Sequence, residues 1–393
     1  MNPNHSAMLP EPFQLKIPSH RQILNTIRVR GEISGAELAR ENNLQPSTLV
    51  YILRSLREKG LIEVSRVGTQ LGSAGKPPTL WQLVADKGYI LGLEIIPNEA
   101  RATVIDFQGH IVHQEHKIGL DNIGPEKLVT SIQSFTEELL KHLNLSPEKI
   151  IGVGVALTGL VDRERGMVHY SRKLELQNFP IENELKQVLP WPVEVVNDAN
   201  AGALGIKWQV GDDQVILQPH VVFLTLNEKT GYFGAGLILN QNLYEGAFGT
   251  AGEIFTSLPN LSEFIETGTS QLGTQHLLLE GEKSRTDLDI EDVIAYAKQG
   301  CELSLFVLRQ YSQFIVEEML RVVQMLNPNV IVLGGDITDA RELILEDIVQ
   351  HVEKELHHIF PSGVPTPDIQ FSKFGMYSVS VGATALILRK IFL

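Results

Sequence analysis

The sequence predicts an α/β fold in which a small N-terminal helical module precedes a body made of two similar halves. Three observations support this prediction: charge is unevenly distributed along the chain, helical periodicity dominates the first 85 residues, and strands alternate with amphipathic helices after Gly88. The chain has 393 residues, of which 43% are hydrophobic and 20% are charged. These proportions are typical of globular proteins and exclude a disordered or collagen-like chain.

Charge separates the N-terminal module from the body. The net charge is −14, yet residues 1–85 contain 10 Lys and Arg against 6 Asp and Glu, whereas the remaining residues contain 23 against 41. A basic end on an acidic body is typical of a DNA-binding head attached to a solubilising body. The alternative is a chance fluctuation in charge.

Composition also bears on the compartment. No stretch approaches the ~18–20 uncharged apolar residues of a membrane span, and the polar start lacks the pattern of a secretory signal. The single cysteine, Cys301, allows no internal disulfide and is expected to be a small core residue. We therefore expect a cytoplasmic protein with no membrane partner.

Residues 19–59 contain three stretches of helical periodicity. Ser34 and Glu37 have the spacing of a capping box, which predicts that the second helix begins at Ser34. The third stretch opens with Pro46, a residue that suits a first helical turn. Its apolar side chains recur at helical spacing: Leu49, Ile52, Leu53 and Leu56. Three helices with a short turn between the second and the third predict a helix-turn-helix.

Two strands follow the third helix, at residues 61–64 and 79–83, and the Gly-, Ser- and Pro-rich residues 68–78 between them predict a wing. A recognition helix presents its N-terminal side chains to base edges, while basic residues bind phosphates. The candidate DNA-binding residues are Gln45, Ser47, Thr48, Tyr51, Arg54, Arg57, Arg66 and Lys76. The alternative is a helical protein-interaction domain whose polar face meets water.

The body repeats one order of elements. Residues 89–112 read as strand, loop, strand, turn and strand, and residues 221–244 repeat that order. A further strand follows in each half, at residues 150–157 and 330–333. Two similar halves imply a cleft, where binding sites of such folds gather. The predicted domains are a flexible N-terminus (1–17), the winged helix-turn-helix (18–85) and the two halves (86–200 and 201–393).

Six short segments of the wing and body have a distinctive order and spacing. They are residues 75–78 (GKPP), 157–162 (LTGLVD), 196–201 (VNDANA), 234–236 (GAG), 246–254 (GAFGTAGEI), and 327–328 (NP) through 334–335 (GG). Together they resemble the ROK family (repressors, open reading frames and kinases), in its branch with an N-terminal winged helix-turn-helix. The resemblance covers residues 19–390. It implies a two-domain, actin-like sugar-kinase (ATPase) fold, a sugar ligand in the cleft, and a homodimer or a dimer of dimers.

The resemblance also implies sugar-binding residues. Asn197 and Asp198 match the pair that binds sugar hydroxyls in the family, where the aspartate is the general base of the kinases. Glu253 and Glu266 match further sugar-binding positions. Carboxylates suit vicinal hydroxyls because they accept two hydrogen bonds. A turn and a helix cap are the alternative explanation for Asn197 and Asp198, since both residue types favour them.

The phosphate-binding segments depart from the family pattern. Kinases of the family have Asp-x-Gly-Gly-Thr where this chain has residues 94–98 (EIIPN). Proline has no amide to donate, and isoleucine blocks the close backbone approach that glycine allows. The second phosphate loop of the family falls on residues 230–232 (TGY), with two of three positions changed. The pair Gly334 and Gly335 remains, although a strand-to-helix turn would also require it. We therefore predict no catalysis and no ATP cofactor.

Metal sites are not predicted. The zinc motif of the family needs histidine and cysteine ligands, and residues 255–264 contain neither. The histidines at positions 110, 113 and 116 are expected to be solvated, because His113 points opposite to the other two on a strand and no carboxylate cluster accompanies them.

The predicted function is sequence-specific DNA binding by a transcriptional regulator, a repressor that reads a palindromic operator as a homodimer. A sugar or sugar derivative in the cleft would be its effector. Two alternatives remain open at this point: an ATP-dependent sugar kinase that uses Asp198 as its base, and a DNA-binding scaffold without a ligand.

Overall fold

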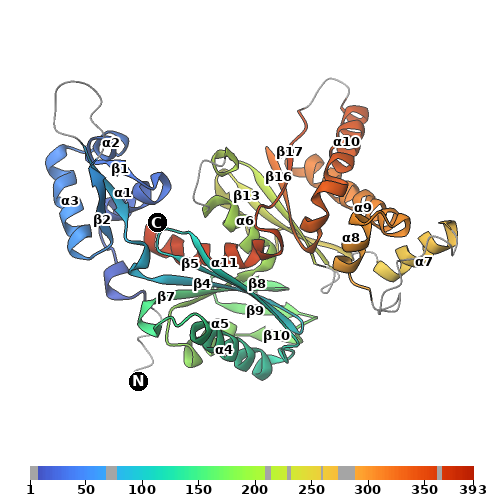
Figure 1. Cartoon of the computed structure of the whole chain (residues 1–393), viewed down its shortest axis with the longest axis horizontal. Coiled ribbons are helices and arrows are strands. Elements are labelled where there is room, and N and C mark those ends of the chain that lie inside the picture. Colours follow the sequence, from blue (N-terminus) through green and yellow to red (C-terminus); the bar gives the residue numbers. More distant parts are fainter. Residues whose placement is uncertain are drawn as a thin grey trace. The chain divides into compact units, whose positions relative to one another are not determined.

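The computed structural model describes residues 8–67, 78–208, 214–227, 232–257, 260–272, 288–360 and 365–393. They form the predicted α/β fold (Figure 1). The chain divides into two compact units, Met1–Ile216 with Ser380–Leu393, and Leu217–Val379. The first unit therefore includes the C-terminal segment, whereas the sequence pattern places that segment in the second half. None of the described helices is long and apolar enough to cross a membrane.

The head contains the three predicted helices and a small sheet. The helices are α1 (Pro18–Arg30), α2 (Gly35–Glu41) and α3 (Pro46–Glu58). The strands β1 (Ile33–Ser34), β2 (Ile62–Val67) and β3 (Thr79–Leu83) pair in the order β1-β3-β2. The predicted capping box starts α2, because Ser34 and Glu37 exchange side-chain and backbone hydrogen bonds. Strand β1 escapes prediction because two residues are too few to show a periodicity.

The head shares a hydrophobic core with the first half of the body. Buried Phe13, which lies within the predicted flexible N-terminus (residues 1–17), contacts Phe107 edge-on with 5.1 Å between ring centroids. Phe107 in turn stacks on Phe392 at 5.7 Å. Phe13 and Leu15 thus belong to this core, although the sequence predicts a flexible N-terminus over residues 1–17. Burial of such aromatic side chains stabilises the head on the body by the hydrophobic effect.

The first half of the body is built on a five-stranded sheet of order β11-β7-β4-β5-β6. Strand β4 pairs antiparallel with β5 and parallel with β7, and β7 pairs parallel with β11. The strands are β4 (Tyr89–Ile96), β5 (Glu99–Asp106), β6 (Ile111–Ile118), β7 (Ile150–Leu157) and β11 (Val193–Asn197). A small second sheet holds β8 (Leu160–Asp162), β9 (Met167–Ser171) and β10 (Leu176–Phe179).

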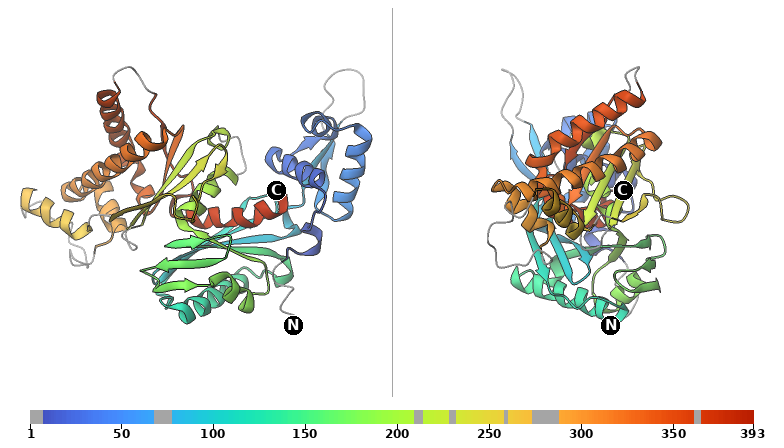
Figure 2. Two further views of the ribbon diagram at one scale, coloured as in Figure 1. Left: turned by 180° about the vertical axis from the view of Figure 1, so that it is seen from behind. Right: turned by 90° about the vertical axis from the view of Figure 1, so that its right-hand side faces the viewer.

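Helices cover both faces of the five-stranded sheet. On one face, α4 (Pro125–His142) and α5 (Ile181–Val188) bury apolar side chains against it. On the other face lies α11 (Ser378–Phe392), as Figure 2 shows. Gly92 and Gly154 allow this approach, because a Cβ at either position would overlap backbone atoms of α11. The remaining helix of this unit, α6 (Asp198–Trp208), directly follows β11.

The second unit repeats the strand order of the first. Its main sheet has the order β14-β13-β12-β16-β17, with β15 also paired to β13. Strand β12 pairs antiparallel with β13 and parallel with β16, and β16 pairs parallel with β17. The same sequence of antiparallel and parallel pairs in both units confirms the predicted internal repeat. The strands are β12 (Val221–Asn227), β13 (Tyr232–Leu239), β14 (Asn242–Leu243), β15 (Glu253–Ser257), β16 (Val330–Gly335) and β17 (Asp368–Phe371).

Among the described residues of the second unit, four α-helices pack around its sheet. They are α7 (Leu261–Leu272), α8 (Ile290–Lys298), α9 (Glu302–Leu326) and α10 (Arg341–Ile359). Cys301 stands at the N-cap of α9 and is partly buried against the core of this unit, as predicted.

Candidate functional site

Helix α3 presents a polar face to solvent. Its apolar stripe is buried, and the predicted base-contacting residues all lie exposed: Gln45, Ser47, Thr48, Tyr51 and Arg54. Gln45 is the N-cap, so Gln45, Ser47 and Thr48 lie at the N-terminal end of the helix, the end that enters the major groove in helix-turn-helix proteins, and Tyr51 and Arg54 lie further along the helix. Val50 is also 65% exposed beside Tyr51. The sequence gives no reason to single it out, but an apolar side chain there suits contact with thymine methyl groups.

Basic residues of the head are paired with carboxylates on its surface. Arg54 lies 2.9 Å from Glu58, one turn further along α3, and Arg66 of β2 lies 2.8 Å from Glu32. Exposed pairs of this kind contribute about 0–1 kcal/mol, so a DNA phosphate can replace the carboxylate at little cost. Arg57 is exposed on the same helix. Lys76 lies outside the described residues.

Asn197 and Asp198 stand where β11 ends and α6 begins. The Asn197 Oδ1 accepts from the Asn200 amide at 3.1 Å, and its Nδ2 donates to the Gly159 carbonyl at 3.0 Å. Asn197 is thus a helix cap that also ties α6 to the turn after β7. The carboxyl ends of parallel strands are the usual place for ligands in α/β folds. A role of Asn197 in sugar binding stays a prediction.

The surroundings of the Asp198 carboxyl combine desolvation with several hydrogen-bond donors. Its Oδ1 accepts from the Ala199 amide at 2.7 Å. Burial raises the pKa of Asp198 to about 6, although hydrogen bonds from the Ala199 amide and from the Asn197 and Thr158 side chains oppose the rise. A carboxyl of this kind can accept hydrogen bonds from sugar hydroxyls, and it can also take up a proton near neutral pH.

Glu253 and Glu266, the other predicted sugar ligands, belong to the second unit. Glu253 opens β15 and is half-buried, and it follows Gly252, whose φ is 87° and whose Cβ would overlap the Ala235 carbonyl. Glycine is therefore required to bring Glu253 to the edge of β13. Glu266 is exposed on α7. The structure thus brings Asn197 and Asp198 together on the first unit, whereas the two glutamates lie on the second unit.

The β4–β5 hairpin uses its backbone groups internally. Its turn is formed by Pro97 and by Asn98 with φ 62°. The Asn98 amide donates to Asn122 Oδ1 at 2.8 Å, and Asn122 Nδ2 donates back to the carbonyls of Ile96 at 2.8 Å and Glu99 at 3.1 Å. Asn122 is fully buried. Nothing in the sequence near the hairpin indicates this clamp, because Asn122 is more than 20 residues away.

Packing accounts for the glycine pair at the end of β16. A Cβ on Gly334 would overlap the Phe223 ring, and one on Gly335, whose φ is 88°, would overlap the Leu226 carbonyl. This confirms that the turn requires small residues, whatever else binds there. Residues 230 and 231 of the second phosphate segment lie outside the described residues.

Family models match both parts of the chain. A model described as the ROK family matches residues 90–390, and one described as winged helix-turn-helix DNA-binding matches residues 18–63. The chain belongs to the ROK family. This confirms the resemblance drawn from six short segments and the fold that it implies.

Several relatives share the arrangement of this ROK protein. The xylose repressor of Caldicellulosiruptor bescii is 24% identical over 93% of this chain and 94% of its own length. The transcriptional dual regulator NagC of Escherichia coli K12 is 22% identical over 99% and 97%. Among solved structures, a ROK family transcriptional regulator aligns with TM-score 0.72 at 19% identity over 95% of this chain and 98% of its own. A ROK family glucokinase from Streptomyces griseus aligns with TM-score 0.65 at 21% identity over 76% and 99%.

A buried arginine joins the head of the ROK protein to the body. Arg28 of α1 is 5% exposed, and it donates to the Trp208 carbonyl at 3.2 Å, at the last residue of α6. Its guanidinium lies 4.7 Å from the centroid of the Trp208 ring and 5.4 Å from that of Phe392. Burial lowers the pKa of Arg28 to about 10, so it stays charged at neutral pH. The sequence cannot reveal this contact, because 180 residues separate its partners.

The three histidines near β6 only partly match the prediction. His113 and His116 do point to opposite faces, and His110 is exposed as expected. However, His116 is 3.1 Å from the Glu99 carboxylate and His113 is 3.3 Å from Glu115. His110 also lies 3.5 Å from the Asp106 carboxylate. The expectation that no carboxylates accompany these histidines is therefore wrong, because such neighbours become visible only in the folded sheet.

Proposed function

We propose that this protein is a transcriptional repressor that binds a palindromic DNA operator as a homodimer and releases it in response to a sugar or sugar derivative. The exposed polar N-terminal part of α3, on a head that matches a winged helix-turn-helix, carries the proposal. The two relatives named as repressor and transcriptional regulator align over head and body alike. A homodimer would place its two recognition helices on half-sites ~34 Å apart or a multiple of it.

The proposed effector site uses Asp198 as its central acceptor. Asn197 fixes the start of α6, so that the Asp198 carboxylate is held in place before a ligand arrives. Glu253 and Glu266 match further sugar-binding positions of the family and lie on the second unit. A sugar that binds one conformation of the protein better than another shifts the equilibrium between them.

Helix α6 is the proposed route from effector to head. Asp198 is its first residue, and Trp208, which Arg28 of α1 holds, is its last. An 11-residue helix is ~16 Å long and bends little, so a displacement at one end reaches the other. Ligand contact with Asp198 would thus bias the position of α1 and, through the shared core of the head, of α3.

A sugar kinase is the second candidate function, because an acid whose pKa is about 6 also suits a general base. Against this candidate, Pro97 has no amide and the Asn98 amide is already donated to Asn122. Ile95 and Ile96 are buried in the strand where glycines would have to admit phosphate. These observations favour a regulator that senses sugar without phosphorylating it.

Selection of duplexes from a random DNA pool tests the DNA-binding part. We expect enrichment of an inverted repeat, and binding of that repeat weakened by one member of a panel of hexoses, pentoses and amino sugars. On the enriched duplex, Arg54→Ala should cost about 1–3 kcal/mol and relax sequence preference. Lys76→Ala should weaken all DNA binding and lower the salt slope by about one. Failure to enrich any repeat would overturn the repressor assignment.

A kinase assay separates the two candidates. The protein is incubated with ATP, magnesium and the same sugar panel, and ADP release is measured. We expect no turnover above the level of Asp198→Asn. Turnover that Asp198→Asn abolishes would establish the kinase. If no sugar shifts the melting temperature or the DNA affinity, the protein is a DNA-binding scaffold without this effector site.

A further inference from the structure

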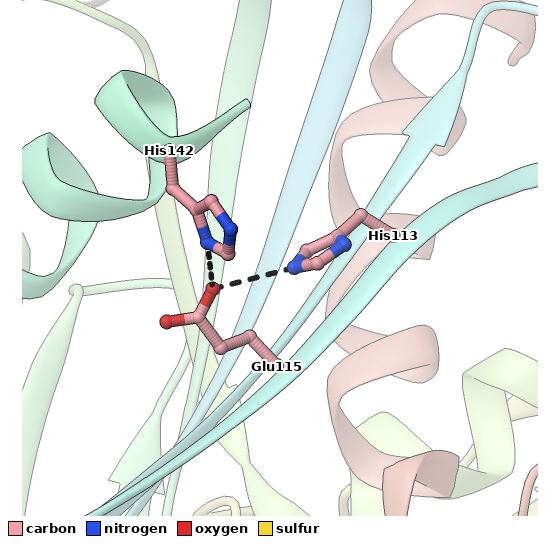
Figure 3. Close-up of side chains that lie close together, drawn as sticks. All are labelled: His113, Glu115 and His142. Carbon is pink, nitrogen blue, oxygen red and sulfur yellow. Dashed lines mark hydrogen bonds and ion pairs between the residues drawn. The ribbon is translucent and has the colours of Figure 1, made fainter. Parts of the chain in front are cut away.

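Two histidines and a glutamate meet on the first unit, outside the residues assigned to DNA or effector binding. His113 and Glu115 are two positions apart on β6, so their side chains point to the same face of the sheet. Helix α4 covers that face and ends at His142 (Figure 3). Glu115 Oε2 lies 3.3 Å from His113 Nε2 and 3.3 Å from His142 Nδ1, and the three ligand atoms lie within 4.8 Å of one another.

These distances suit a metal ion. In a tetrahedral zinc site with bonds of ~2.0–2.1 Å, neighbouring ligand atoms are ~3.3 Å apart, which both nitrogen–oxygen distances match. Two imidazoles and one carboxylate form a donor set that favours zinc and similar transition metal ions over magnesium or calcium. We propose that His113, Glu115 and His142 bind a divalent transition metal ion, for which Zn²⁺ is the probe.

Accessibility and local charge agree with a metal site. The side chains of His113 and Glu115 are each 26% exposed and that of His142 is 67% exposed, so an ion can enter from solvent and keep a water ligand. The neighbouring cation on the same face of β6, Lys117, forms an ion pair with Glu138 of α4 and lies 5.9 Å from the Phe135 ring centroid. The Lys117 charge is therefore balanced beside the site.

Without a metal, the same three side chains form a hydrogen-bonded cluster. Glu115 Oε2 then accepts from both imidazoles, and each facing nitrogen must carry a proton. A metal ion needs the lone pair of each facing nitrogen, so the proton of each neutral imidazole must then sit on the other ring nitrogen, and an imidazole that carries protons on both nitrogens cannot bind the ion. In the metal-free state hydrogen bonds connect the middle of β6 to the last residue of α4, whereas in the metal-bound state coordinate bonds connect them. This site is separate from residues 255–264, where the zinc motif of the family is missing, and it does not depend on the proposed regulatory function.

Calorimetric titration of the full chain with ZnCl₂ at neutral pH tests the proposal. We expect one equivalent of zinc to bind and to raise the melting temperature, with no such rise for magnesium. His142→Ala should weaken zinc binding about tenfold or more, as should Glu115→Gln, which keeps the shape and hydrogen-bonding capacity of the side chain. His142 is exposed at a helix end, so the metal-free melting temperature of His142→Ala should match that of the wild type.

His110→Ala is the matched control, because His110 precedes the same strand, is 61% exposed in its side chain and is not part of the cluster. It should bind zinc as the wild type does. The proposal is overturned if the wild type binds no zinc, or if His142→Ala and Glu115→Gln bind it with unchanged affinity and stoichiometry.

Discussion

Helix α6 meets a charged group at each of its ends, and the two ends differ in what their charges can do. Asp198 starts the helix, and Arg28 of the head lies beyond its last residue. The helix dipole favours a negative charge at the first place and a positive charge at the second. Burial opposes both, raising the pKa of Asp198 to about 6 and lowering that of Arg28 to about 10.

The difference lies in how close each group comes to losing its charge. Arg28 stays charged throughout the physiological range, so its bond to the Trp208 carbonyl is a fixed anchor between head and body. Asp198 titrates just below neutral pH, so a ligand or a proton can change its state. We infer that a responsive end and a rigid end of one helix form the simplest coupling between effector and head.

Arg28→Ala is the change with the largest expected effect, because it removes the anchor. The Trp208 carbonyl loses a charged donor, two aromatic rings lose their cation, and a cavity forms beneath the head. Relief of the arginine's desolvation offsets part of this, which leaves a net loss of about 2–3 kcal/mol. Thermal unfolding measures the loss, and DNA binding with and without the active sugar should show that the response has disappeared.

Arg30→Ala is the control for this change. Arg30 lies on the same helix but pairs with Glu41 on the surface at 2.6 Å, with its side chain 57% exposed. Its removal should cost less than about 1 kcal/mol and leave the sugar response intact. An equal loss of response in both variants would show that α1 is simply intolerant of change.

Asp198→Asn should have the second-largest effect, and its sign is opposite. The folded pKa of Asp198, about 6, lies above its ordinary value, so the folded state binds more protons between about pH 4 and pH 6 and wild-type stability falls as pH rises through that range. Above pH 6 the full cost of the buried charge is present. Asparagine removes that cost, so the variant should be more stable by about 1–2 kcal/mol at pH 7.5 while it loses sugar binding.

Melting temperatures from pH 4 to pH 8 measure this difference. The gap between Asp198→Asn and the wild type should widen up to about pH 6 and then stay constant. A gap that is constant from pH 4 upward would mean that the Asp198 carboxyl is not the titrating group.

Features that depend on neighbouring positions can be predicted from the sequence. In the head, Ser34 and Glu37 are three positions apart and predict a capping box, and the buried stripe of α3 with its helical spacing predicts which face of that helix is exposed. At the start of α6, the segment of residues 196–201 resembles the ROK family and so identifies Asp198. In each case the signal lies within a few neighbouring positions.

Contacts between distant positions carry no such signal. Arg28 reads as one more basic residue of a helix, and only the fold sets it on Trp208. Asn122 and His142 likewise acquire their partners when β4, β6 and α4 come together. The packing of α11 on Gly92 and Gly154 also joins the last residues of the chain to its first sheet, which a linear division into halves could not reveal.

Arg28→Lys tests whether the positive charge of Arg28 or its planar guanidinium group holds the head on the body. Lysine keeps the positive charge but loses the planar group that lies on the two aromatic rings, and its single nitrogen cannot contact both Trp208 and Asn25 as Arg28 does. We expect a loss of about 1 kcal/mol and a weakened but measurable sugar response. A response as complete as that of the wild type would mean that charge alone holds the head.

The double variant Arg28→Ala, Asp198→Asn tests the smallest expected effect, which is the coupling between the two changes in unfolding free energy. The ends of α6 are ~16 Å apart and share no partner, so the two changes in unfolding free energy should add within about 0.5 kcal/mol. The sugar response of DNA binding should behave otherwise: each single change already abolishes it, so the double variant loses nothing more. The opposite result would contradict the roles proposed for the two ends. If the changes in unfolding free energy do not add while the losses of sugar response do, the two ends are coupled through the stability of the helix and not through ligand binding at Asp198.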